Sequence, residues 1–132
     1  MRFSTTLTDD ALEELRAAFD PSARLVIVES PYAGDVDANV CYARAAVRDA
    51  LQRGEYPIAS HLLYTQPGIL DDRNPAERAL GIRAGLAWGT CASRSVVYTD
   101  RGITDGMRKG IAHAEREGRV VEYRTVPGWV GA

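Results

Sequence analysis

The chain has 132 residues, the usual size of one domain, and 45% of them are hydrophobic, so a continuous core can form without disulfides or a metal. Sixteen basic residues against eighteen acidic ones give a formal net charge of -2. This balance argues against a polymeric nucleic acid as partner, because such partners bind to strongly basic surfaces.

The first residues lead into a charged helix rather than into the apolar stretch of a signal peptide, and no run is long enough to cross a bilayer. We therefore expect a cytoplasmic protein with no membrane partner. Cys41 and Cys91, the two cysteines, fall in segments with a helical pattern and not in a metal-ligand pair such as C-x-x-C. The sequence predicts buried free thiols and no metal site.

The chain begins with a predicted helix over residues 9–19, which Thr8 caps and Pro21 closes. The next segment, 24–29, is an apolar run rich in β-branched residues. That pattern is typical of a central strand that is buried on both faces.

A turn cluster over 30–35 is followed by helical spacing from about 36 to 52. Residues 56–60 form a short second strand, and Pro57 favours a place near the edge of the sheet. Residues 61–73 are predicted to be a long functional loop.

Asn74 caps a third predicted helix that ends near residue 92. Its buried stripe is expected to contain Ala79, Ile82, Leu86 and Trp88. The remaining elements are a strand over 95–99, a loop over 100–104, a helix over 105–117 and a last strand over 119–123.

This order predicts an α/β fold, a Rossmann-like three-layer sandwich with a parallel sheet of four or five strands in the order 2-1-3-4 and helices on both faces. The domain divides into an N-terminal helix over 9–19, a core over 24–124 and a tail over 125–132, which is expected to be mobile or to form an interface. Ligands of such sheets bind at the carboxyl ends of the strands, so three loops are candidates for a site.

The first candidate loop lies between the central strand and a helix N-terminus, where an anion can bind. Tyr32 can stack on a base or hydrogen-bond a sugar, while Asp35 and Asp37 can bind ribose hydroxyls or cap the helix. A simple turn with helix caps explains the same residues equally well. Neither G-x-G-x-x-G nor a Walker-type sequence is present.

The second loop contributes His61, either as a site residue with a pKa near neutrality or as a structural hydrogen-bonding residue. Asp71 and Asp72 point apart in an extended loop, so one of them is expected to enter the site. In the third loop, Thr104 can contact a phosphate or cap the following helix, while His113, later in that helix, is expected to face solvent.

Five short motifs in these segments resemble a small family of phage and bacterial proteins related to the nucleoside 2-deoxyribosyltransferases. They are Val28-Glu29-Ser30-Pro31-Tyr32-Ala33-Gly34-Asp35, Ser60-His61-Leu62-Leu63, Leu70-Asp71-Asp72, Arg83-Ala84-Gly85-Leu86 and Thr104-Asp105-Gly106-Met107. The resemblance spans roughly residues 25–123. It implies a Rossmann-like fold, a homodimer or higher homo-oligomer, and a nucleoside or nucleotide pocket at the strand ends.

The transferases cleave an N-glycosidic bond with a carboxylate nucleophile. The resemblance implies this glutamate four residues after Gly106, where the sequence has Gly110, and a second carboxylate near Gly85. The mechanism therefore does not carry over whole. Substitute carboxylates are Asp72, Glu77, Asp100 and Glu115, of which Asp100 is the best placed because it ends a central strand.

The leading hypothesis is a nucleoside- or nucleotide-binding protein without a cofactor. Substrate contacts are expected from Ser30, Pro31, Tyr32, Asp35, His61, Asp72, Arg83, Thr104, Gly106 and Met107. The first alternative is an N-glycosidase or deoxyribosyltransferase that uses a displaced carboxylate. The second is an interaction module whose exposed Trp129 tail matters more than the loops.

Overall fold

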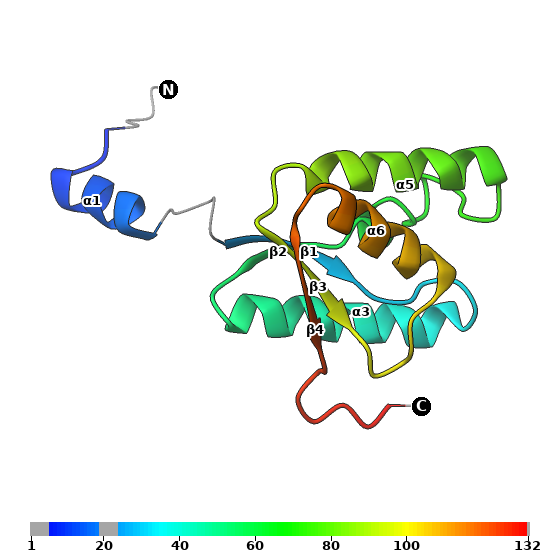
Figure 1. Cartoon of the computed structure of the whole chain (residues 1–132). Helices are drawn as coiled ribbons and strands as arrows, with labels where there is room; N and C mark the ends of the chain where they lie inside the picture. Colours follow the sequence, from blue (N-terminus) through cyan, green and yellow to red (C-terminus); the bar gives the residue numbers. More distant parts are fainter. Residues whose placement is uncertain (1–5, 19–23, 132) are drawn as a thin grey trace.

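Four parallel strands pair in the order β2-β1-β3-β4, which confirms the predicted topology (Figure 1). The computed structural model describes residues 6–18 and 24–131. The strands are β1 (Leu25–Glu29), β2 (Tyr56–Ile58), β3 (Arg94–Tyr98) and β4 (Val120–Arg124). The helices are α1 (Asp9–Ala18), α3 (Val36–Gln52), α4 (Ser60–Leu63), α5 (Pro75–Gly89) and α6 (Asp105–Arg116).

The helices form layers on both faces of the sheet, with α3 on one face and α5 and α6 on the other (Figure 1). Side chains alternate between the two faces along a strand. Val26 and Val28 of β1 therefore pack with α3 residues in the larger core cluster, whereas Val97 of β3 packs with Met107 on α6. The same alternation directs Ile27 toward the α5 and α6 side.

Four of the helices start at polar side chains that accept backbone N–H groups, and for α1 this is the predicted Thr8, which accepts from the amide of Ala11 at 3.1 Å. Asp35 accepts from the amide of Ala38, Asn74 from two amides of the first turn of α5, and Thr104 from the amide of Met107 at 3.3 Å. These contacts satisfy donors that the first helical turn leaves open. They also fix where each loop after a strand ends.

The structure corrects the prediction for residues 61–73 and for α5. The second strand ends at Ile58 rather than at residue 60, the short helix α4 takes up Ser60 and the first three residues of the predicted loop, and α5 ends at Gly89 rather than near residue 92. Ala79 is exposed and Trp88 is 55% exposed, because only one side of α5 packs against the body. Ile82 and Leu86 are on that side and are half-buried.

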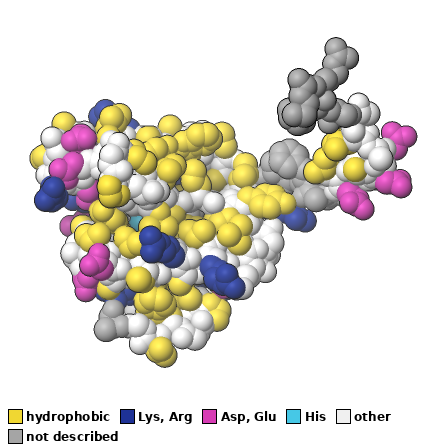
Figure 2. Space-filling model, turned by 180° about the vertical axis from the view of Figure 1, so that it is seen from behind, with side chains coloured by type: hydrophobic (Ala, Val, Ile, Leu, Met, Phe, Trp, Pro, Cys, Tyr) yellow, Lys and Arg dark blue, Asp and Glu magenta, His cyan; other side chains and the backbone are white. Residues whose placement is uncertain are grey.

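Both cysteines are exposed, contrary to the expectation of buried thiols. Cys41 lies on the outer side of α3, and Cys91 follows the end of α5. Apolar side chains also spread over the surface of the body that Figure 2 shows. The exposed ones include Leu63, Leu80 and Trp88, on α4 and α5.

The C-terminal segment packs on the core instead of extending from it. The ring of Trp129 is half-buried and meets Tyr42 edge to face, with centroids 4.9 Å apart. The predicted end of the first helix at residue 19 and its closing Pro21 lie outside the described residues. Within residues 6–18 and 24–131, no helix is both long enough and apolar enough to span a membrane.

Candidate functional site

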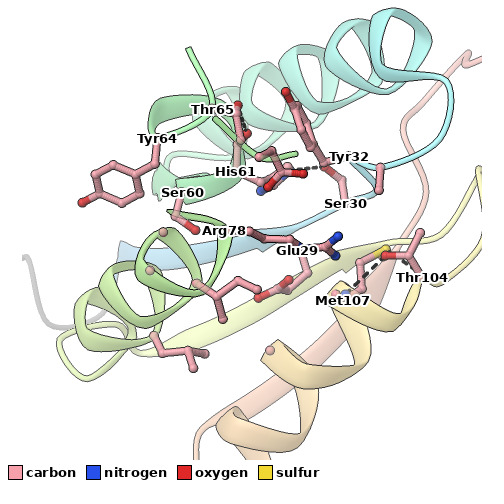
Figure 3. Close-up of a pocket in the computed structure, with 18 of the residues that line it drawn as sticks. Glu29, Ser30, Tyr32, Ser60, His61, Tyr64, Thr65, Arg78, Thr104 and Met107 are labelled. Atoms are coloured by element: carbon pink, nitrogen blue, oxygen red, sulfur yellow. Dashed lines mark hydrogen bonds between the residues drawn. The ribbon is translucent and has the colours of Figure 1, made fainter. Parts of the chain in front are cut away.

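The loops that follow β1, β2 and β3 meet at one cavity of about 410 Å³ (Figure 3). Tyr32, His61 and Thr104, one from each loop, all line it. The cavity opens at the carboxyl ends of the strands, beside the point where the strand order reverses. Its volume lies within the roughly 300–1,000 Å³ that is usual for small-molecule sites.

The structure brings most of the predicted contact residues together in this cavity. Those that line it are Ser30, Tyr32, His61, Asp72, Thr104, Gly106 and Met107. Pro31 is buried beside it, and Asp35 is turned away to cap α3. Arg83 is on the exposed side of α5 and does not line the cavity.

Asp100 also lies outside the cavity, although it follows β3 directly. Its carboxylate accepts hydrogen bonds from the Tyr42 hydroxyl at 2.6 Å and from the Val126 amide at 2.8 Å, on the α3 side of the sheet. Of the other suggested carboxylates, Glu77 lines the cavity and Glu115 does not. Asp100 therefore joins the C-terminal segment to the core and does not face a ligand.

A neutral histidine forms part of the cavity wall. His61 Nε2 and Ser30 Oγ are 2.7 Å apart and share a hydrogen bond. Burial lowers the pKa of His61 to about 4, because a low-dielectric environment disfavours the charged ring. At neutral pH the pair offers a hydroxyl and an uncharged imidazole, and both can donate or accept a hydrogen bond.

Glu29 is the site residue that sequence reasoning missed. It ends β1 two residues after Ile27, so alternation places both side chains on the cavity side of the sheet, and both line the cavity. Burial raises the pKa of Glu29 to about 8, and the charge of Arg119 opposes part of this rise. Glu29 is therefore a neutral acid at pH 7.

Two glycines leave the room that this arrangement needs. A Cβ atom at Gly110 would lie 2.2 Å from Oε1 of Glu29, and one at Gly85 would lie 2.3 Å from Oγ of Ser60. Gly110 and Gly85 are the positions at which the family resemblance implied carboxylates. Side chains that come from β1 and α4 fill the space there instead.

Arg78 is the second residue that the sequence analysis did not select. It lies on α5 one turn before Ile82, and Figure 3 shows its guanidinium group pointing into the cavity. No hydrogen bond or ion pair to this guanidinium is formed by the part of the chain that the structure describes. The cavity thus holds a half-buried cation that is available to a ligand.

The chemistry of the wall favours an organic ligand over a metal ion. Among the described residues, no group of three or more His, Cys, Asp or Glu side chains is arranged to hold a metal. The wall instead combines apolar and aromatic side chains with a neutral acid, a neutral imidazole and the start of α6. Small-molecule sites commonly combine a mostly apolar wall with a few placed polar groups in this way.

The fold and the site define an α/β domain of Rossmann-like topology with a pocket at the carboxyl ends of its central strands. The chain belongs to the family described as Domain of unknown function (DUF7768), which matches residues 24–124. This range runs from the start of β1 to the end of β4 and includes every residue of the pocket. No curated protein and no solved structure matches the chain.

Proposed function

We propose that the chain binds a nucleoside or a nucleoside monophosphate in the pocket. The observation that carries this proposal is the meeting of an aromatic ring, an unpartnered guanidinium and a helix N-terminus in one cavity of about 410 Å³. Tyr32, Arg78 and Thr104 supply these three features from separate elements. A nucleoside monophosphate can use all three, because its base packs on an aromatic ring and its phosphate pairs with a guanidinium and a helix N-terminus.

The base is accommodated by the apolar part of the wall. Leu70, Ile82 and Leu86 form an aliphatic surface, and Tyr32 adds an aromatic ring. The ring of Tyr64 points away from the other labelled residues (Figure 3), and its hydroxyl accepts a hydrogen bond from Nε1 of Trp88 at 3.0 Å. A flat heterocycle gains both apolar burial and ring contacts on such a surface.

The polar part of the wall suits a sugar and a phosphate. Ser30 and His61 present neutral donors and acceptors for hydroxyl groups. Arg78 can bind two phosphate oxygens at once, and the start of α6 adds backbone N–H groups at Asp105 and Gly106.

Isothermal titration calorimetry against nucleosides, nucleoside monophosphates and NAD-derived nucleotides tests the proposal. Tyr32→Ala should weaken every binder. Arg78→Ala should weaken monophosphates more than nucleosides, by about tenfold to a hundredfold, because a charge-assisted hydrogen bond contributes about 1.5–3 kcal/mol. Arg83→Ala, on the exposed side of the same helix, is the matched control. Absence of heat with every compound contradicts the proposal.

A second candidate function is that of an N-glycosidase or deoxyribosyltransferase. The position of Glu29 favours it, because a carboxyl group does line the pocket although Gly110 and Gly85 lack one. Incubating deoxynucleosides and their monophosphates with the protein and measuring free base tests this function. The function is supported if the wild type releases free base, Glu29→Gln abolishes this release and Asp100→Asn preserves it. If the wild type releases no base, the function is rejected.

The expectation of a homo-oligomer also stays a proposal. Leu80 and Trp88 are 48% and 55% exposed on α5, a helix that is apolar on several sides. Such a face is usual where a second subunit packs. Light scattering compares the wild type with Leu80→Glu, and a monomeric wild type contradicts the proposal.

A further inference from the structure

The carboxyl group of Glu29 forms no hydrogen bond with any residue that the structure describes. It points from the end of β1 toward α6 (Figure 3). The cation beside it, Arg119, is already engaged with Oγ of Ser95, the carbonyl of Gly89 and a carboxylate oxygen of Glu117, at 3.0, 2.8 and 2.8 Å. Both carboxyl oxygens of Glu29 are therefore available to a ligand.

Such an arrangement is unfavourable for the free protein. Glu29 is half-buried, and a carboxyl group in a low-dielectric cavity wall without a hydrogen-bond partner is less favourable than one that pairs with a ligand. Gly110 leaves room for the carboxyl group itself, because a Cβ atom at that position would lie 2.2 Å from Oε1. The acid is thus held against α6 and lies in a cavity wall that carries both apolar and polar side chains.

We infer that Glu29 recognises the edge of a nucleobase as a neutral acid, its O–H donating to a ring nitrogen and its carbonyl oxygen accepting from the neighbouring amino group. This inference rests on the proposed function and names the class of base. Adenine and cytosine both present a ring nitrogen beside an amino group, so we expect the pocket to prefer them.

The protonation state of the acid determines which edges fit. A neutral carboxyl group has one donor and one acceptor, whereas a carboxylate only accepts and suits an edge with two donors, such as the N1–H and amino group of guanine. Burial keeps Glu29 neutral at pH 7. Lactam bases such as uracil offer a less basic carbonyl oxygen to the acid's proton, so we expect them to bind more weakly.

Several charged or titratable groups line the same cavity and enter the pH dependence. They are Tyr32 from the loop after β1, His61 from α4, Tyr64 directly after α4, Asp72 from the loop before α5, Glu77 and Arg78 from α5, Asp105 from α6, and Arg119 before β4. Burial lowers the pKa of His61 to about 4, so its ring does not titrate between pH 6 and pH 10. A fall of affinity near pH 8 is assigned to Glu29 when the Glu29→Gln variant does not show it.

Calorimetry with adenosine and cytidine from about pH 6 to pH 10 tests the inference. Wild-type affinity should stay level below pH 8 and then fall tenfold per unit, to about a hundredth by pH 10, because only the neutral acid donates. Glu29→Gln keeps one donor and one acceptor, so it should bind without this fall. Glu29→Leu fills similar space without polar atoms, so it should bind about tenfold or more weakly than the wild type below pH 8 and show no further fall above pH 8.

The outcomes separate this inference from the proposed function. No binding of any nucleoside overturns both. If Tyr32→Ala weakens binding, the proposed function stands, and three results then overturn the inference alone. They are an affinity that is level through pH 8, equal affinities of the Glu29→Gln and Glu29→Leu variants, or the tightest binding for guanosine. Carbon-13 NMR of the glutamate carboxyl groups, comparing the wild type with Glu29→Gln, measures the acid without any ligand. A carboxyl that titrates near 4.5 also overturns the inference.

Discussion

Replacing Glu29 by Gln should stabilise the protein by an amount that grows with pH. Burial raises the pKa of this acid from 4.5 to about 8. Each pKa unit corresponds to about 1.4 kcal/mol, so ionised Glu29 destabilises the fold by about 4–5 kcal/mol above pH 8 relative to its neutral form. Glutamine has nearly the same shape and does not ionise in either state.

The sign follows from which state holds the proton. Below pH 4.5 the acid is protonated in the folded and unfolded chains alike, and Glu29 adds no pH dependence. Between pH 4.5 and pH 8 the unfolded chain loses the proton while the folded protein retains it, so the free energy of unfolding falls as pH rises. Above pH 8 both states are ionised, and the difference levels off.

Urea unfolding followed by circular dichroism, at intervals from about pH 4.5 to pH 9, measures this difference. The stability of Glu29→Gln relative to the wild type should rise by about 3 kcal/mol between pH 4.5 and pH 7, and further up to pH 8. A difference that does not vary with pH would refute the claim that the acid is buried and neutral. A constant offset between the two proteins would not affect the test, because only the slope reports on the proton.

Gly110→Ala should destabilise the protein by about 1–3 kcal/mol in thermal unfolding, because its Cβ would lie 2.2 Å from Glu29; Gly106→Ala, whose Cβ meets its nearest atom at 3.9 Å, should be tolerated. In a Glu29→Ala background, Gly110→Ala should no longer destabilise the protein, because the carboxyl group that its Cβ meets is gone. If the effects of the two substitutions on stability are additive, the two residues are not in contact. Arg124→Met should lower the free energy of unfolding by about 3–5 kcal/mol, because the variant leaves the carboxylates of Glu55 and Glu122 without the buried guanidinium that pairs with them in the wild type. A change within about 1 kcal/mol contradicts this prediction. The free energy of unfolding of the wild type should fall as pH drops from about 6.5 to about 4, because the lowered pKa of His61 makes its protonation unfavourable in the fold. His61→Gln should abolish this fall, and an unchanged pH profile of stability in the variant contradicts the prediction.

The fold could be predicted because each element carries its own local signal. The β-branched run of β1 is buried as expected, with Val26 and Val28 each 1% exposed. Helix starts at Asn74 and Thr104 follow from side chains that cap them. Right-handed crossovers between successive parallel strands then restrict the order to a few possibilities, of which 2-1-3-4 is the one found.

The site was harder to predict because orientation around a helix decides which side chains reach the cavity. Arg78 and Arg83 are five residues apart on α5 and so lie on different sides of it. A helix that is apolar on several sides gives no clear stripe from which to choose, and the resemblance directed attention to Arg83. The structure shows that the side with Arg78, Ile82 and Gly85 faces the cavity.

Glu29 was missed for a different reason. A charged residue that ends an apolar strand is usually the first solvated position after the core, and nothing nearby in sequence indicates that α5 and α6 enclose it. Its alternation with Ile27 was a usable signal, since Ile27 lies on the face opposite to Val26 and Val28. The loop residues Tyr32, His61 and Thr104 needed only the rule that strand ends converge, and they do meet in the cavity.

The proton on Glu29 also distinguishes the functions that this pocket can have. A nucleophilic carboxyl group must be ionised to attack a sugar, and burial keeps Glu29 neutral up to about pH 8. The carboxyl group of Glu29 reaches from β1 to Gly110, the position at which the resemblance implied a nucleophilic glutamate. Glu29 therefore lies where a nucleophile is expected but lacks the negative charge that nucleophilic attack requires. If the protein cleaves a glycosidic bond, Glu29 must therefore donate a proton to the departing base, and the rate must fall above pH 8. A rate that rises through pH 8 would assign Glu29 the nucleophilic role instead.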